Sequence, residues 1–185
     1  MNVILTPRLE LRRPVMSDVP AIVPLVDNIQ VSSMTARIPY PYTAADAEAF
    51  VAWADSGNAR VLVRRDHGDL IGCIGVEPGD PPELGYWLGE PYWGHGYTTE
   101  AARAMLLETF ADAGTDVVVS HCRTINAGSR RVLEKCGFRY IGPGEMTSRA
   151  LGETTLPARR YRLERAGWLA TATMERQVLP VGTNA

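Results

Sequence analysis

A short turn with two glycines is the stretch of this sequence whose residue types point most directly to chemistry. It runs from Trp93 to Thr99 (WGHGYTT) and stands between an expected strand and an expected helix. Gly94 and Gly96 let the backbone approach a ligand without a Cβ in the way. The N-terminus of a helix presents backbone N–H groups that bind anions. The turn therefore predicts a pyrophosphate site, and a tight connection that binds nothing is the alternative.

Two other phosphate-binding loops fit this turn poorly. A P-loop needs a Lys followed by Ser or Thr after its glycines, and that pair is absent here. A dinucleotide-binding fingerprint needs a third glycine where the chain has Thr99, although Asp116 stands at a suitable spacing for that motif. The missing glycine and the aromatic strand before the turn argue against a Rossmann-type site.

The composition is that of one globular domain. The 185 residues suit a single domain, and 45% hydrophobic residues can bury a sizeable core. The formal net charge is −2 and the basic residues occur in scattered pairs, which argues against a nucleic-acid partner. With no visible signal peptide or membrane span, we expect a cytoplasmic protein with three reduced cysteines. The cysteines and histidines lack zinc-ligand spacing, so we expect no metal.

Periodicity and capping signals predict the elements that must position the turn. The first elements are a strand over residues 5–13, a helix over 17–28 capped by Ser17, an ordered loop over 29–42 and a helix that begins with the capping box Thr43–Asp46. A hairpin of strands 60–65 and 70–76 follows, and then a strand over 83–89. The last elements are a helix over 98–113, a strand over 116–122, a helix over 127–136 that ends at Gly137, and closing strands over 138–141 and 159–164.

This order of elements predicts a mixed sheet covered by helices, which is an α+β or layered α/β fold. We expect residues 1–168 to form one domain. The tail over residues 169–185 shows no pattern and is expected to be disordered.

The glycine turn resembles the acyl-CoA pyrophosphate loop of the GNAT superfamily of N-acetyltransferases. That loop has Gln or Arg, two residues, Gly, one residue, and then Gly or Ala, so Trp93 and Thr98 depart from it. The wider run 85–101 is more similar to one branch, the ribosomal-protein N-terminal acetyltransferases of the RimJ/RimL type. The other three blocks that resemble this branch are Thr6–Arg12, Pro39–Tyr42, and a block made of Asn126–Ser129 followed by Leu133–Phe138.

The resemblance implies the GNAT fold, a mostly antiparallel central sheet whose fourth and fifth strands splay apart. It implies acetyl-CoA as co-substrate, no metal, and direct acetyl transfer to a primary amine, with a protein N-terminal α-amine as the expected acceptor. The alternatives are a small-molecule acetyltransferase, acting on an antibiotic or metabolite amine, and a non-catalytic CoA-binding module. The expected partners are the amine acceptor and a second copy of the chain in a homodimer, with no nucleic acid and no membrane.

The resemblance also assigns the residues that bind the coenzyme. The diphosphate is expected at the turn, and backbone N–H groups at the end of the fourth strand are expected to bind the pantetheine or the acetyl oxygen. The assigned residues are Leu88, Gly89, Trp93, Gly94, His95, Gly96, Tyr97, Thr98, Thr99, Asn126 and Ser129. Asn126 is alternatively the N-cap of its helix, and both roles are compatible.

For the base, the resemblance directs attention to His121, because related enzymes often carry a catalytic Glu five residues before the Asn at position 126. Neutralising an α-amine at pH 7 costs about 1 kcal/mol, whereas a Lys costs about 4–5 kcal/mol, so a histidine suffices for an α-amine. A histidine satisfied at a strand end is the alternative. Glu83 is the second candidate, acting through water, unless it is a solvated strand-end carboxylate.

For the acid, many superfamily members carry a Tyr where this chain has Leu133, so the resemblance leaves Ser129 to face the sulfur of the coenzyme. A polar residue in the first turn of a helix is the alternative. Cys122 adjoins His121, but consecutive strand residues face opposite sides, so a Cys–His nucleophile is not expected. Tyr86 is expected in the core, and Tyr40 and Tyr42 are expected to shape the acceptor pocket.

Overall fold

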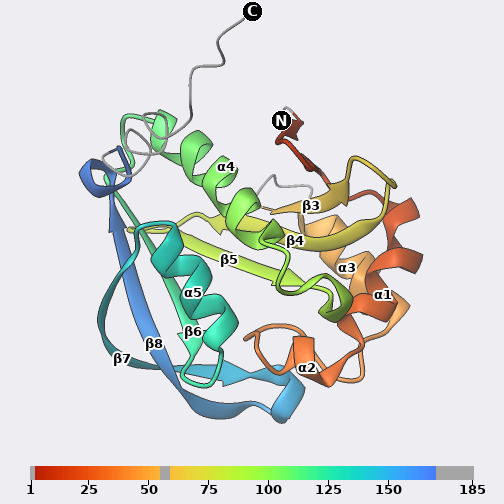
Figure 1. Ribbon diagram of the computed structural model, residues 1–185. Helices are drawn as coiled ribbons and strands as arrows, with labels where there is room; N and C mark the ends of the chain where they lie inside the picture. Colours follow the sequence, from red (N-terminus) through yellow and green to blue (C-terminus); the bar gives the residue numbers. More distant parts are fainter. Residues whose placement is uncertain (1–2, 55–58, 170–185) are drawn as a thin grey trace, which may run out of the picture.

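The chain folds into one mixed sheet with helices on both faces, in a computed structural model that describes residues 3–54 and 59–169 (Figure 1). The eight strands lie in the order β1-β2-β3-β4-β5-β6-β8-β7. The strands are β1 (Ile4–Leu5), β2 (Leu9–Arg12), β3 (Ala59–Arg64), β4 (Leu70–Glu77), β5 (Glu83–Leu88), β6 (Val117–Arg123), β7 (Arg139–Ser148) and β8 (Thr154–Glu164). The helices are α1 (Val19–Val26), α2 (Ile29–Ser32), α3 (Ala44–Ala54), α4 (Tyr97–Ala111) and α5 (Ala127–Lys135), with single 3₁₀ turns over Met16–Asp18, Glu90–Tyr92 and Arg149–Leu151.

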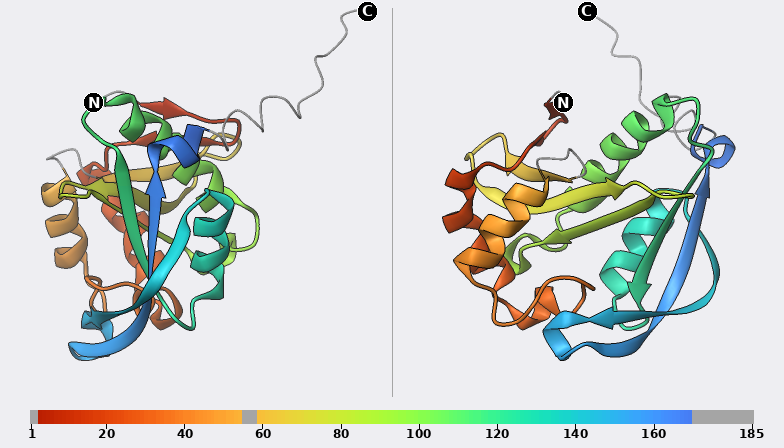
Figure 2. Two further views of the ribbon diagram at one scale, coloured as in Figure 1. Left: turned by 90° about the vertical axis from the view of Figure 1, so that its left-hand side faces the viewer. Right: turned by 180° about the vertical axis from the view of Figure 1, so that it is seen from behind.

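The strands β5 and β6 run parallel and stay together only at their beginnings. Their ladder has one register pair, Glu83 with Val119, next to which Ser120 Oγ donates a hydrogen bond to Leu84 O at 2.8 Å. Beyond these residues the strands diverge, as Figures 1 and 2 show. The predicted splay is confirmed. It falls on the fifth and sixth strands because the N-terminal segment forms two short strands, β1 and β2.

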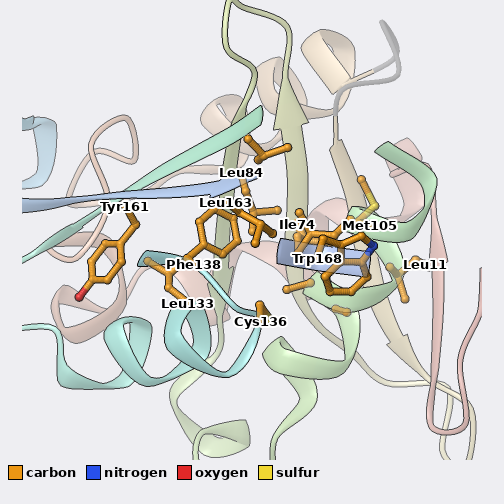
Figure 3. Packing of buried hydrophobic residues seen from close by; sticks show 14 of the residues in the cluster. Leu11, Ile74, Leu84, Met105, Leu133, Cys136, Phe138, Tyr161, Leu163 and Trp168 are labelled. Carbon is orange, nitrogen blue, oxygen red and sulfur yellow. The ribbon is translucent and has the colours of Figure 1, made fainter. Parts of the chain in front are cut away.

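Two layers of helices bury the two faces of the sheet. Helices α4 and α5 cover one face, and α1 and α3 cover the other (Figure 2). Met105 of α4 and Leu133 of α5 belong to the core against Leu84 of the sheet (Figure 3). On the second face, Val51 of α3 packs in one cluster with Val61 of β3. Because strand residues alternate between faces, each functional side chain on β5 or β6 belongs either to the α4/α5 face or to the α1/α3 face.

Several local signals read from the sequence form the predicted structure. The capping box at Thr43 is present, since Thr43 N donates to Asp46 Oδ2 at 2.9 Å and Asp46 N donates to Thr43 Oγ1 at 3.3 Å. Gly137 follows α5 with a φ of +88°, the left-handed conformation that ends many helices. The strands β3 and β4 form the predicted antiparallel hairpin.

The N-terminal helix differs from its prediction. Ser17 is not its N-cap, because a 3₁₀ turn over Met16–Asp18 precedes α1. The Asp18 carboxylate organises this turn, accepting from Val15 N at 2.9 Å and from two N–H groups of Arg12 at 2.7 and 2.8 Å. The ion pair between Asp18 and Arg12 of β2 therefore sets where the helix begins, and a local capping pattern does not contain this contact. The segment predicted as a loop over residues 29–42 contains the short helix α2.

The closing strands are much longer than predicted. β7 and β8 form one antiparallel hairpin with a register shift between Tyr140 and Gly142. Glycines and prolines in this stretch weaken the alternating pattern, which explains why its middle was not predicted as strand. The predicted tail lies, apart from Leu169, outside the described residues. Within the described part of the chain, no helix is long and apolar enough to cross a membrane.

The close approach of β4 and β5 generates a stability prediction. A Cβ on Gly72 would stand 2.5 Å from Trp87 O, whereas a Cβ on Gly85 of the neighbouring strand would meet nothing within 4 Å. We expect Gly72→Ala to lower the free energy of unfolding by about 1–3 kcal/mol, because the two backbones must separate. The matched Gly85→Ala should change it by no more than about 0.5 kcal/mol. Denaturant unfolding measures both, and equal effects would contradict the contact.

Candidate active site

The predicted glycine turn is formed at the N-terminus of α4. Gly94 and Gly96 both adopt a φ of +81°, a conformation that L residues with side chains rarely take, and Gly96 is the N-cap of α4. A Cβ on Gly94 would meet nothing within 4 Å, so this side of the turn is open. The first backbone N–H groups of α4 have no partners within the helix. The turn has the geometry of an anion site.

The turn is joined to the end of β5 by a tryptophan. Trp93 Nε1 donates to Leu88 O at 2.7 Å, which fixes the distance between the strand and the turn. The neighbouring N–H of Gly89 donates to Ile71 O of β4 at 2.9 Å. It is therefore engaged in the sheet, contrary to its predicted role toward the pantetheine. Because hydrogen-bonding directions alternate along a strand, the N–H of Leu88 points away from β4, toward β6.

The two residues considered as alternative bases form one hydrogen-bonded pair. His121 Nδ1 lies 2.9 Å from Glu83 Oε1. An ionised carboxylate only accepts hydrogen bonds, so Nδ1 carries the proton and Nε2 is left as the basic nitrogen. The hydrogen bond from the ring to Glu83 raises the pKa of His121, against the opposing effects of burial and of Arg160. His121 is accordingly oriented and made more basic by Glu83.

The pair lies on the α1/α3 face of the sheet. Leu84 and Cys122, the next residues on each strand, are buried in the core under α4 and α5. Alternation along each strand then directs Glu83 and His121 to the opposite face. Cys122 is thus separated from His121 by the sheet, as predicted, and burial raises the pKa of its thiol.

Asn126 and Ser129 occupy the first turn of α5. Asn126 Oδ1 accepts a hydrogen bond from Ser129 N at 2.9 Å, so the N-cap role proposed as an alternative is confirmed. This bond places the Ser129 side chain toward β5. There its hydroxyl lies 2.8 Å from the hydroxyl of Tyr86. Leu133, one turn further along, is fully buried in the core and offers no acid.

Tyr86 is a site candidate that the sequence analysis assigned to the core. Its ring extends from β5 across to α5, where its hydroxyl contacts both the hydroxyl and the carbonyl oxygen of Ser129. Burial raises the pKa of Tyr86, so the phenol keeps its proton and can donate it in a hydrogen bond. Tyr86 shares its strand face with Leu84 and Leu88, which is why its pattern indicated a core residue.

The segment over residues 33–37 crosses the α1/α3 face in front of the diverging strands. At one end, Arg123 Nη1 of β6 donates to Ser33 O at 2.9 Å. At the other, Arg37 donates two hydrogen bonds of 2.5 Å to the carboxylate of Glu77 on β4. The segment therefore spans from β6 to β4, across β5, on the face that carries the partly exposed His121–Glu83 pair.

The tip of the β7–β8 hairpin contacts the segment over residues 33–37. Arg149 N donates to Ala36 O at 3.0 Å, and Figure 1 shows the hairpin reaching the segment beside α2. Tyr42 is buried among residues of α1 and α3, and burial raises its pKa to about 12. Tyr42 thus packs in the core, whereas Tyr40 is exposed, and their predicted part in an acceptor pocket stays a prediction.

Comparison with known proteins identifies the family. The sequence matches the acetyltransferase (GNAT) domain family over residues 8–139. The chain belongs to the GNAT acetyltransferase family. Its fold is similar to that of RimL, a ribosomal L7/L12 α-N-protein acetyltransferase solved in complex with coenzyme A, with a TM-score of 0.71 and 22% identity, covering 88% of this chain and 98% of that one.

Curated relatives of this GNAT chain match over shorter stretches. It is 36% identical over 62 residues to the FsC-acetyl coenzyme A-N(2)-transacetylase of Aspergillus fumigatus, covering 34% of this chain and 26% of that protein. It is 33% identical over 106 residues to the uncharacterized N-acetyltransferase YnaD of Bacillus subtilis, covering 55% of this chain and 62% of that protein. The chain thus spans less than two thirds of the length of each of these relatives.

The His121–Glu83 contact generates a titration prediction. NMR titration of the His121 ring should give a pKa above the ordinary 6.5, because the ionised Glu83 stabilises the imidazolium. In Glu83→Gln the amide oxygen still accepts from Nδ1 but the charge is lost, so the pKa should fall. The matched control is Glu77→Gln, which removes a neighbouring negative charge, because Glu77 of β4 is the register partner of Glu83 on β5. An equal fall in both variants would show a general field effect instead of the specific contact.

Proposed function

We propose that this chain is an acetyl-CoA-dependent N-acetyltransferase that moves the acetyl group directly to a primary amine, with a protein N-terminal α-amine as the acceptor. The observation that carries the proposal is the oriented His121–Glu83 pair at the point where the ladder between β5 and β6 ends and the strands begin to diverge. The glycine turn at the start of α4 lies at the end of the same strand β5. A base and an anion site thus flank one opening in the sheet, as transfer from an anionic acyl donor requires.

For the coenzyme, the residues present offer a consistent path. The open turn over residues 93–99 suits the diphosphate. From there the N–H of Leu88, which points toward β6, suits the pantetheine or the acetyl oxygen. The amide nitrogen of Asn126 remains for the pantetheine, because the hydrogen bond at the N-cap uses its oxygen.

The side chains on the two faces of the sheet have different roles in the proposed reaction. The acceptor nitrogen forms a bond to the acetyl carbon while the carbon–sulfur bond breaks. His121 Nε2 takes the proton that the amine loses, and Glu83 holds the resulting imidazolium. On the α4/α5 face, the Ser129 hydroxyl, held by Tyr86, donates a hydrogen bond that stabilises the leaving thiolate, which takes its proton from solvent. Glu83 thereby acts as an orienting group, and a separate role as base is unnecessary.

The choice of an α-amine rests on access and on basicity. The segment over residues 33–37 crosses the face that carries His121, whose side chain stays 31% exposed, and this favours a flexible chain end over the flat surface of a folded protein. An α-amine also has a pKa close to that of a histidine, so a single imidazole can deprotonate it. RimL, whose fold is similar, is described as an α-N-protein acetyltransferase. A cytoplasmic location, where nascent N-termini are available, is part of the proposal.

A small-molecule amine is the second candidate acceptor. The relative from Aspergillus fumigatus is named as an acetyl coenzyme A transacetylase acting at an N(2) position, although the match spans about a quarter of that protein. Incubating the purified chain with acetyl-CoA and a panel of peptides with free N-termini, Nα-blocked lysine peptides and small amines, read by mass spectrometry, separates the candidates. Acetylation of free N-termini supports the proposal, acetylation of small amines alone supports the second candidate, and no acetylation with retained CoA binding would indicate a binding module.

His121 gives the sharpest kinetic prediction. We expect His121→Ala to lower kcat by roughly 10²–10⁴, the usual contribution of a general base, with little change in the KM for acetyl-CoA. In the wild type the acidic limb of the pH–rate profile should lie above pH 6.5, because the pKa of His121 is raised and only the neutral ring accepts a proton. Glu83→Gln should move that limb to lower pH. A near-wild-type kcat for His121→Ala between pH 6 and 9 would exclude this base.

A further inference from the structure

An arginine from the N-terminal segment lies directly against the glycine turn. Arg8 stands between β1 and β2, yet all the partners of its guanidinium belong to residues 95–100. Its Nε donates to Glu100 Oε2 at 2.7 Å and its Nη1 donates to His95 O at 2.9 Å. Its Cζ lies 4.6 Å above the ring of Tyr97. The guanidinium is therefore held in one orientation from three directions.

The partner Glu100 explains why a cation is needed at this place. Its carboxylate accepts from Thr6 Oγ1 at 2.6 Å and from Arg8 N at 2.9 Å, besides the Arg8 side chain. Burial alone would raise the pKa of Glu100, but these hydrogen bonds hold it below its ordinary value, so the group is ionised. A negative charge in the first turn of α4 repels a diphosphate at the same helix end. Arg8 compensates that charge where the anion must bind.

The guanidinium also has donors to spare. An arginine offers five N–H groups, and the bonds to Glu100 and His95 need only part of them. Its Nη2 lies 3.6 Å from the position that a Cβ on Gly96 would take, beside the open side of the turn. The side chain remains 47% exposed, so an anion in the turn can reach it. This places a fixed, permanently charged donor next to backbone N–H groups that bind anions.

We propose that Arg8 is a coenzyme A-binding residue that contacts the diphosphate, and that the Thr6–Arg8 segment thereby sets the affinity for the acyl donor. The inference rests on the proposed function for the identity of the ligand. It predicts that the contribution of Arg8 depends on the phosphates of the donor, and that it is independent of the acetyl group and of the acceptor.

The test compares two acyl donors that share the acetylated pantetheine, of which the second lacks the phosphates together with the adenosine. With acetyl-CoA, Arg8→Gln should raise KM by roughly ten- to a hundred-fold, the usual effect of losing a hydrogen bond to a charged group, with kcat nearly unchanged. With S-acetylpantetheine, which lacks the diphosphate, Arg8→Gln should leave KM unchanged. Arg8→Lys, which keeps the charge but cannot form the same set of contacts, should raise the KM for acetyl-CoA less. It serves as the test variant if Arg8→Gln does not fold.

The matched control is Arg162→Gln. Arg162 is on β8, is 45% exposed, and pairs with Glu164 at 3.3 Å, so its exposure is similar to that of Arg8 and its partner is also a glutamate. It should leave both KM values unchanged. A KM for acetyl-CoA that stays at the wild-type value in Arg8→Gln would overturn the inference. So would an equal rise with both donors, because that would mean that Arg8 only shapes the turn.

Binding measurements keep this test separate from the proposed function. Calorimetric titration of the wild type, Arg8→Gln and Arg162→Gln with CoA and with pantetheine needs no acceptor. A selective loss of CoA affinity in Arg8→Gln supports the inference even if the chain acetylates none of the amines supplied, which would contradict the proposed function alone. Acetylation by a wild type whose CoA affinity is insensitive to Arg8→Gln would contradict the inference alone.

Discussion

The parallel contact between β5 and β6 is the constraint on which the rest of the site depends. Antiparallel ladders hold the other neighbouring strands together, but this pair shares one register position, Glu83 with Val119, and a side-chain bond from Ser120 to Leu84. Beyond that point, backbone groups of β5 point toward β6 without a ladder to receive them. The same divergence leaves the N-terminus of α4 facing the end of β5, to which Trp93 joins it. A fully paired sheet at this position would remove the opening, the backbone donors and the access to either face.

Around this opening, the two faces of the sheet carry different functional groups. Alternation along β5 and β6 places Glu83 and His121 toward the α1/α3 face, and places Tyr86 toward the α4/α5 face, where it meets Ser129. The proposed base and the hydroxyl pair proposed for the thiolate therefore lie on opposite faces of the sheet, without contacting each other. The N-cap of α5 contributes directly, since the bond from Ser129 N to Asn126 orients the first turn of the helix. This one hydrogen bond both caps the helix and sets the position of Ser129.

Segments distant in sequence complete the site from the outside. The stretch before β2 brings Arg8 to the start of α4, where Glu100 holds it. The segment over residues 33–37 crosses the opposite face through Arg123 and Glu77, with the β7–β8 hairpin behind it. Both use arginines that bind backbone carbonyls or carboxylates with fixed geometry. The glycine turn and the face of the His121–Glu83 pair are thus each flanked by chain that the central sheet alone would not supply.

The sequence by itself determined the features that depend on local geometry. The glycine turn before α4, the capping box at Thr43, the glycine after α5 and the alternation of β6 were all predicted, because each is encoded within a few residues. Four ordered blocks resembling one family also indicated the splayed sheet. Only the tertiary structure decided that His121 and Glu83 are one pair, that Tyr86 reaches Ser129, that Gly89 is engaged by β4, and that Arg8 lies on the turn. Each of those facts joins residues on different elements, and strand register and helix placement, which no local pattern contains, set the distance between them.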